Sequence, residues 1–214
     1  MLNVYKYHTN STELPLYNKL SDKLHLIGTA RTWTPDMMDE LEPVKNVIAN
    51  NPRAAYNYAF RVVRGRFPEG EAAIGRVADL AYDYAWTILS NDPEWVKIKG
   101  HEHGRWPEAE DTIKTDPHSA FYYADYIIKG RWEEAEPYIL KQVNISVEYA
   151  IDVLKCRWKD VGRPEAEQAI MKDPELAFIY ARRIIKDRWL EAEPYIKTDA
   201  HIWKDYRRTF KVKE

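Results

Sequence analysis

A Tyr-Ala pair that recurs in a fixed register is the feature that most constrains how this chain can fold. The pair occurs at Tyr58-Ala59, Tyr84-Ala85, Tyr123-Ala124, Tyr149-Ala150 and Tyr180-Ala181. An isoleucine stands eleven residues before each of these alanines, and in all units but the first a glutamate stands fourteen residues before it. A short unit of this kind cannot bury its apolar side alone, so the sequence predicts an array of stacked units.

The repeat has a basic period of 26 residues, which is the distance from Tyr123 to Tyr149. Thirteen extra residues precede Tyr123 and five precede Tyr180. We expect both insertions between a Tyr-Ala helix and the next Gly-Arg turn, at one type of loop. Beyond Tyr180 the frame gives a sixth, degraded unit, in which Arg207 replaces the alanine as suits a terminal cap that faces water.

Each unit is interpreted as two helices. In the third unit, Asp116 and Pro117 are typical of a helix start, and apolar residues follow Ala120 at helical spacing. Gly130 is predicted to supply the left-handed residue that ends this helix. The carboxylates that follow would lie in the first turn of the next helix, where the helix dipole favours them. Pro137 comes four residues after the expected start, so that turn is loose or the helix begins later.

The repeat frame fades before residue 45, which divides the chain into two segments. Residues 1–44 are interpreted as a divergent N-terminal cap, and residues 45–214 as a helical-repeat domain that is stacked on the cap as one elongated unit. Residues 36–48 are predicted to form one longer first helix, and residues 4–7 a short strand or an arm. The predicted fold class is all-α, an α-solenoid of about six short helix-turn-helix repeats.

Charge and cysteine content exclude several functional classes. The chain has 32 Lys and Arg against 34 Asp and Glu, so no overall basic field draws it to nucleic acid or anionic lipid. Cys156 is the only cysteine, which rules out an intramolecular disulfide and favours a cytoplasmic location. The sequence has neither a signal-peptide pattern nor an apolar run of about 18 residues, so we expect a soluble protein without a membrane segment.

No motif in the sequence predicts an enzyme. The GxxxxGK[ST], GxSxG and GxGxxG patterns do not occur, and the paired carboxylates recur as helix-start residues rather than as one catalytic pair. His101-Glu102-His103 is the sharpest metal candidate, but no third ligand can be nominated, and an exposed insertion loop is the simpler interpretation. Cys156 has no identifiable activating base. We therefore expect no catalytic residue, no cofactor and no bound metal.

The repeated string resembles a helical repeat found in many uncharacterised bacteriophage proteins. It has the form Tyr-Ala, two apolar residues, GRW.EAE..I and DP..A, and the resemblance covers residues 45–207. Residues 162–167, GRPEAE, depart from the pattern because tryptophan is absent before the proline, although Arg157-Trp158 lies just upstream. The resemblance implies a viral origin rather than a reaction. A host factor or defence component, inhibited by the binding itself in the host cytoplasm, would then be the target.

Several aromatic and arginine side chains are not required by the repeat. The position just after the Tyr-Ala pair holds Phe60 and Trp86 in the first two units but other residue types later, so the fold does not demand an aromatic residue there. The candidate partner-binding residues are Phe60, Trp86, Trp95, Tyr122, Tyr126, Arg182 and Arg183. Aromatic residues and arginine are the usual anchors of protein interfaces, with burial between repeats as the alternative for each. The expected function is non-catalytic binding of a macromolecular partner, most of all a protein.

A nucleic-acid-binding or nucleotide-sequestering repeat is the alternative function. Arginine precedes an aromatic residue in several units, and these pairs would form a ladder along one edge, as in proteins that stack bases. The pairs are Arg66-Phe67, Arg105-Trp106, Arg131-Trp132 and Arg188-Trp189. The C-terminal tail, residues 203–214, is the most basic segment. Core packing of the aromatic rings, with each arginine bonded to exposed helix-terminal carbonyls or to a glutamate of its own or an adjacent unit, is the simpler interpretation.

Overall fold

The computed structural model describes residues 22, 23, 25, 35–39 and 41–212, and throughout these residues the regular structure is helical, without a β-strand. The predicted strand or arm at residues 4–7 lies outside the described residues. The helices are α2 (Pro35–Asp39), α3 (Lys45–Asn50), α4 (Pro52–Asn57), α5 (Pro68–Ile74), α6 (Ala78–Thr87), α7 (Pro107–Ile113), α8 (Pro117–Tyr122), α9 (Glu136–Ile139), α10 (Val143–Tyr149), α11 (Pro164–Ile170), α12 (Pro174–Tyr180), α13 (Glu193–Ile196) and α14 (Ala200–Phe210).

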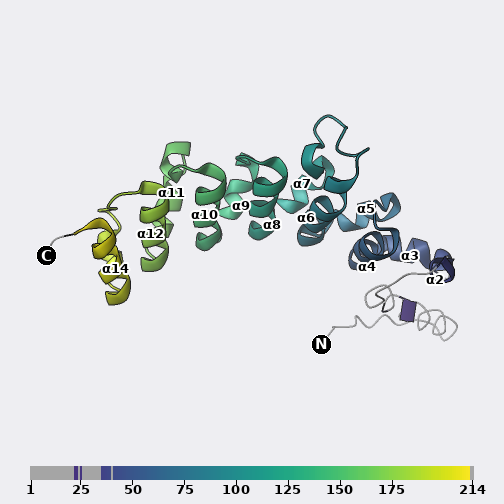
Figure 1. Ribbon diagram of the computed structural model, residues 1–214, viewed down its shortest axis with the longest axis horizontal. Helices are drawn as coiled ribbons and strands as arrows, with labels where there is room; N and C mark the ends of the chain where they lie inside the picture. The colour runs from purple at the N-terminus through teal and green to yellow at the C-terminus, as the bar shows by residue number, and fades with distance from the viewer. Residues whose placement is uncertain (1–21, 24, 26–34, 40, 213–214) are drawn as a thin grey trace.

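Helices α3 to α14 form six consecutive pairs that follow one another along the long axis of the molecule (Figure 1). We call the first helix of each pair the A helix and the second, which carries the Tyr-Ala position, the B helix. Each B helix contacts the A helix that follows it and the B helices of the neighbouring units. This order confirms the all-α helical-repeat fold that the register predicts, because the units pack against their neighbours in chain order.

The apolar positions that define the register form the core. The alanine of the Tyr-Ala pair is fully buried in each of the five units, and so is the isoleucine of each preceding A helix. In the third unit, Tyr123 and Ile127 complete the buried stripe of the B helix. The small alanine side chain lets two helices approach closely at this position.

The B helices start as predicted but end differently. The Asp116 carboxylate accepts a hydrogen bond from the Ser119 amide at 2.8 Å, which confirms the N-cap of α8. At the other end, a wider π-helical turn follows α8 at Tyr123–Ile128, and Lys129, with φ of 57°, is the left-handed residue. The prediction of Gly130 was wrong because the Ala124 carbonyl accepts from both amides, so the chain reverses one residue before the glycine.

Left-handed basic residues recur at this position along the array. The equivalents of Lys129 are Arg64, Lys155, Lys186 and Lys211. A side chain in this conformation costs about 1 kcal/mol relative to glycine. A positive charge at the negative end of a helix offsets part of that cost, so a cation is a reasonable substitute for glycine here.

Two further helix boundaries bear on the sequence-based expectations. A 3₁₀ turn at Glu133–Ala135 precedes α9, which begins at Glu136, so the late-start alternative raised by Pro137 is confirmed. The single first helix expected over residues 36–48 was wrong, because the structure has a 3₁₀ turn at Glu42–Val44 between α2 and α3. Pro43, inside that turn, has no amide hydrogen to continue a helical hydrogen-bond ladder.

Candidate functional site

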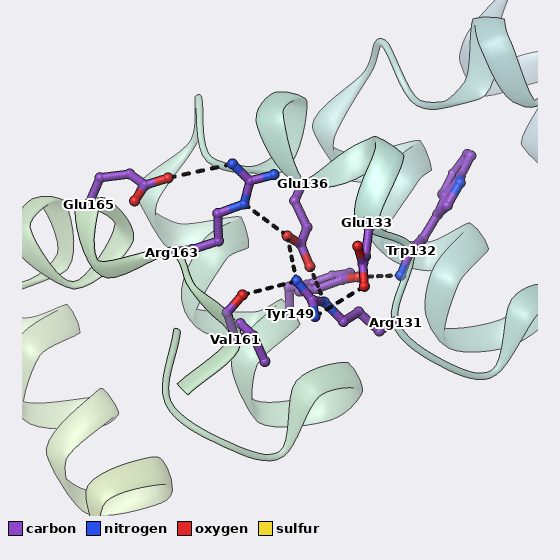
Figure 2. Close-up of polar contacts among 8 residues, drawn as sticks. All are labelled: Arg131, Trp132, Glu133, Glu136, Tyr149, Val161, Arg163 and Glu165. Carbon is purple, nitrogen blue, oxygen red and sulfur yellow. Dashed lines mark hydrogen bonds and ion pairs between the residues drawn. The ribbon is translucent and has the colours of Figure 1, made fainter. Parts of the chain in front are cut away.

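The segment that joins each B helix to the next A helix holds a polar cluster that we call the repeat junction. At the junction between the third and fourth units, the Arg131 guanidinium donates two hydrogen bonds to the Glu136 carboxylate, at 2.6 and 3.2 Å. The Trp132 amide donates to the Tyr149 hydroxyl at 2.7 Å, from the B helix of the next unit (Figure 2). The other junctions contain Arg66, Phe67, Glu71 and Tyr84; Arg105, Trp106, Glu110 and Tyr123; Arg157, Trp158, Glu167 and Tyr180; and Arg188, Trp189, Glu193 and Tyr206.

The ring of each junction tyrosine also contacts the next junction. The hydroxyl of Tyr149 accepts from Trp132 on one side, while its ring stacks on Trp158 on the other, with 5.4 Å between ring centroids. The ring pairs Tyr84–Trp106, Tyr123–Trp132 and Tyr180–Trp189 repeat this contact. The repeated tyrosine therefore connects three successive units, and the Gly-Arg-aromatic-acid string is explained by stacking.

The arginine and aromatic residues of the expected ladder belong to these junctions. Each arginine of the four pairs donates to a glutamate of its junction, and each aromatic side chain beside it is buried. This confirms the simpler interpretation of those residues as structural. Of the features that suggested nucleic-acid binding, the basic side chains Lys204, Arg208 and Lys211 of the C-terminal tail are not among the junction residues.

The fourth junction shows where the second insertion lies. Arg157 donates to Glu167 at 2.6 Å, and the Trp158 amide donates to the Tyr180 hydroxyl at 2.8 Å, so this pair occupies the place of the Gly-Arg-aromatic turn. The extra residues therefore follow the turn instead of preceding it. The expected position of this insertion was wrong, because Arg157-Trp158 rather than Gly162-Arg163 forms the junction.

The residues of this insertion fold back onto the preceding junction (Figure 2). Glu136 is fully buried, and its carboxylate accepts from Arg163 at 3.1 Å as well as from Arg131. Arg131 also donates to the Val161 carbonyl at 3.2 Å. One buried carboxylate thus holds two guanidinium groups from different units. Exposed Glu133 and Glu165 form the outer ion pairs of the two arginines.

Replacing Tyr180 with phenylalanine isolates the hydroxyl of a junction tyrosine. This buried hydroxyl accepts from the Trp158 amide and donates to Glu167 at 3.1 Å. Burial raises the pKa of Glu167, but hydrogen bonds from Arg157 and the Lys159 amide outweigh it and leave the pKa below its usual value. Glu167 is therefore a charged acceptor at neutral pH. Without the hydroxyl, a buried amide loses its acceptor, and we expect the free energy of unfolding to fall by about 1–3 kcal/mol.

Urea unfolding followed by circular dichroism measures this change, with Tyr195→Phe as the matched control. Tyr195 is exposed, and we expect its substitution to change the free energy of unfolding by less than about 0.5 kcal/mol. Equal effects of the two substitutions would show that the junction hydroxyl contributes nothing specific.

A group of exposed aromatic side chains remains once the junctions are explained. Trp86 on α6 is 44% exposed, and Tyr122 and Tyr126, on α8 and the π-helical turn after it, are 37% and 42% exposed. Ring centroids lie 5.2 Å apart for Trp86–Tyr126, 5.9 Å for Tyr82–Tyr122 and 6.0 Å for Tyr122–Tyr126. We call Tyr82, Trp86, Tyr122 and Tyr126 the aromatic face, because they form one connected surface across two neighbouring units.

The other candidate residues lie in different surroundings. Phe60 is exposed and stacks on Tyr56, four residues earlier in the same unit on α4, with 5.9 Å between ring centroids. Trp95 is buried: its indole donates to the Arg105 carbonyl at 3.0 Å, and the Arg66 guanidinium lies 4.3 Å from its ring centroid. The alternative interpretation, burial, therefore holds for Trp95, which attaches the long insertion to the array.

The two candidate arginines lie away from the aromatic face. Arg182 and Arg183 are exposed on the π-helical turn Ala181–Ile185, in the fifth unit, two units beyond the aromatic face. The Arg182 guanidinium lies over the Phe178 ring, 5.4 Å from its centroid. The structure therefore brings together three of the predicted residues, Trp86, Tyr122 and Tyr126.

Sequence reasoning missed Tyr82, the half-buried member of the aromatic face. Tyr82 and Trp86 stand at i and i+4, as do Tyr122 and Tyr126, and residues at that spacing are neighbours on one side of a helix. A search for aromatic pairs at that spacing would have found both rows. The column-by-column comparison of units did not, because the two rows differ by one residue in register.

Two further observations on the described residues concern metal binding and thiol chemistry. The His101 ring contacts Trp95, with 4.2 Å between centroids, and His103 is exposed; in residues 41–212 and the few described before them, no group of three His, Cys, Asp or Glu is placed to hold a metal. Burial raises the pKa of the Cys156 thiol, which disfavours a nucleophilic thiolate.

No helix within the described part of the chain has the length and apolar character to cross a membrane. Comparison of the chain with protein-family models, curated proteins and solved structures finds no match.

Proposed function

We propose that this protein is a non-catalytic helical-repeat protein that binds a protein partner through the aromatic face. The observation that supports the proposal is the exposure of Trp86, Tyr122 and Tyr126 in mutual contact on neighbouring units. The rings contact one another across the two units but keep more than a third of their surface exposed, whereas the junction aromatic residues that hold the units together are buried. Connected aromatic surface is typical of interaction sites, and large rings are the side chains that most often dominate binding energy.

The resemblance to bacteriophage repeat proteins extends this proposal to the kind of partner. If the chain shares the origin of that group, the partner is a protein of the bacterial host, such as a defence component, and occupation of its surface is the inhibitory event. The extended row of B helices suits this role. A stacked array presents a preformed surface, so binding costs little further loss of conformational entropy.

Capture of the partner by wild-type and variant protein tests the proposal. Immobilised protein is exposed to host lysate, the captured protein is identified, and its affinity is then measured with purified components. Trp86→Ala combined with Tyr126→Ala is expected to weaken binding at least about 30-fold, which corresponds to the loss of a hot spot of about 2 kcal/mol. Leu190→Ala combined with Ile98→Ala is the matched control, since both are exposed apolar side chains elsewhere on the array.

The proposal predicts that the control binds as the wild type does. An affinity that the Trp86 and Tyr126 substitutions leave unchanged, in a variant with the wild-type circular dichroism spectrum, would place the binding surface elsewhere.

A further inference from the structure

Two carboxylates flank the aromatic face on the two units that carry it. Asp83 follows Tyr82 on α6, and Asp125 precedes Tyr126 on the neighbouring unit. Both are half-buried, and neither is among the ion pairs formed by the described residues. Burial raises the pKa of both carboxyl groups, and a second carboxylate adds to it in each case, Asp79 for Asp83 and Asp152 for Asp125. Two half-buried carboxylates that lie outside the ion pairs of the described residues therefore stand on neighbouring units.

The two carboxylates also raise the pKa of a tyrosine in the aromatic face. The pKa of Tyr82 is raised to about 12, first by burial and then by Asp83, with Asp125 contributing as well. Asp83 stands three residues before Trp86, and Asp125 stands three residues after Tyr122, so each carboxylate lies beside a ring of the aromatic face on one side of its helix. The combination of electron-rich ring faces with carboxylates is the chemistry that binds organic cations, through cation–π contacts and charge-assisted hydrogen bonds.

The cations of the neighbouring helices do not neutralise this region. Arg53, at the start of α4, is paired with Asp79 at 3.4 Å and only partly opposes the effect of burial on Asp83. Lys155 lowers the pKa of Asp125, but the net shift is still upward. Among the described residues, neither Arg53 nor Lys155 forms an ion pair with Asp83 or Asp125, and the pKa of both carboxyl groups stays raised.

We propose that the occupant of the aromatic face is a basic segment of a protein partner, whose arginine or lysine side chains lie over Trp86 and the tyrosine rings and pair with Asp83 and Asp125. An apolar or acidic occupant would cover two unpaired carboxylates without compensating them, which opposes binding. A basic occupant supplies the missing partners as it removes water. This inference rests on the proposed function and specifies the charge of its partner.

Short peptides of defined charge test the inference on the full chain. Three nonapeptides alternate glycine with arginine, glutamate or glutamine, and binding is followed through the indole N–H resonance of Trp86, assigned with a Trp86→Phe variant. The arginine peptide alone is expected to shift this resonance, and its affinity should fall as salt rises from about 50 to 300 mM. Asp83→Asn combined with Asp125→Asn should weaken the arginine peptide about tenfold, because two charge-assisted contacts are lost.

The matched control removes two negative charges at a different place on the array. Glu134 and Glu191 are exposed in the turns ahead of α9 and α13, and Glu134→Gln combined with Glu191→Gln should leave the affinity unchanged. Equal binding of the three peptides, no shift of Trp86 at millimolar arginine peptide, or equal loss in the two double variants would each overturn the inference. The proposed function fails separately, if the Trp86→Ala and Tyr126→Ala substitutions leave capture of the protein partner intact.

Discussion

Replacing Glu136 with glutamine is expected to lower the free energy of unfolding by about 3–5 kcal/mol, the usual effect of removing one partner from a buried ion pair. Glu136 is fully buried and accepts from both Arg131 and Arg163. Glutamine keeps the size of the side chain but removes the charge, and its amide group presents donors to guanidinium groups that are themselves donors. Two arginines would then share one neutral oxygen and keep only their outer pairs with Glu133 and Glu165, so the loss comes from weaker charge compensation and not from a cavity.

Glu133 provides the control on the same arginine. Its carboxylate lies 3.2 Å from Arg131, but the Glu133 side chain is 69% exposed. Because water screens an exposed pair, Glu133→Gln should change the free energy of unfolding by less than about 1 kcal/mol. Urea unfolding of both variants, monitored by far-ultraviolet circular dichroism, gives the comparison. Similar losses would mean that burial of the Glu136 carboxylate is unimportant to the junction.

The register of the repeat made the architecture predictable. The Tyr-Ala pair and the isoleucine before it mark positions that every unit buries, so their spacing fixes both helices and the way they stack. Asp116 could be identified as an N-cap because capping involves only residues close in sequence. Local chemistry and core burial point to the same arrangement at these positions, which is why sequence reasoning succeeded there.

The errors occurred where distant residues decide a local feature. Gly130 is the residue that local chemistry favours for the end of a helix, but the widened turn after α8 places the reversal at Lys129. The fourth junction was misplaced because its identity depends on Glu167 and Tyr180, which lie 10 and 22 residues beyond Arg157 and Trp158 respectively. The sequence comparison matched the Gly-Arg motif at Gly162-Arg163. In the structure, the junction is formed by Arg157, which lies within hydrogen-bond distance of the Glu167 carboxylate.

The candidate site was only partly predictable, since exposure depends on what lies opposite a side chain. Trp86 and Trp95 are tryptophans nine positions apart in the sequence, yet Trp86 is 44% exposed and Trp95 is 6% exposed. Trp95 is covered because the long insertion folds it against Arg66 and the Arg105 carbonyl. Nothing in the immediate sequence of either residue indicates this difference, which comes from the path of the insertion.

Trp158→Ala is expected to lower the free energy of unfolding by about 3–5 kcal/mol, as for other large aromatic side chains removed from a core. Trp158 is fully buried, stacks on Tyr149 and donates its indole N–H to the Ser146 carbonyl at 2.9 Å. Truncation would leave a cavity between the fourth and fifth units and remove the indole hydrogen bond to the Ser146 carbonyl, which still accepts from the Ala150 amide. Because a stacked array depends on nearest-neighbour contacts, we expect the loss to split urea unfolding into two transitions at that boundary.

Trp86→Ala is the matched control for this loss, because it removes the same side chain from the aromatic face. We expect a clearly smaller fall in the free energy of unfolding than for Trp158→Ala, since a side chain that is 44% exposed loses less burial when it is truncated. Its effect should appear in partner binding, whereas Trp158→Ala acts on folding. A loss of stability at Trp86 as large as that at Trp158 would show that the aromatic face belongs to the core, and the argument for a binding surface would then fail.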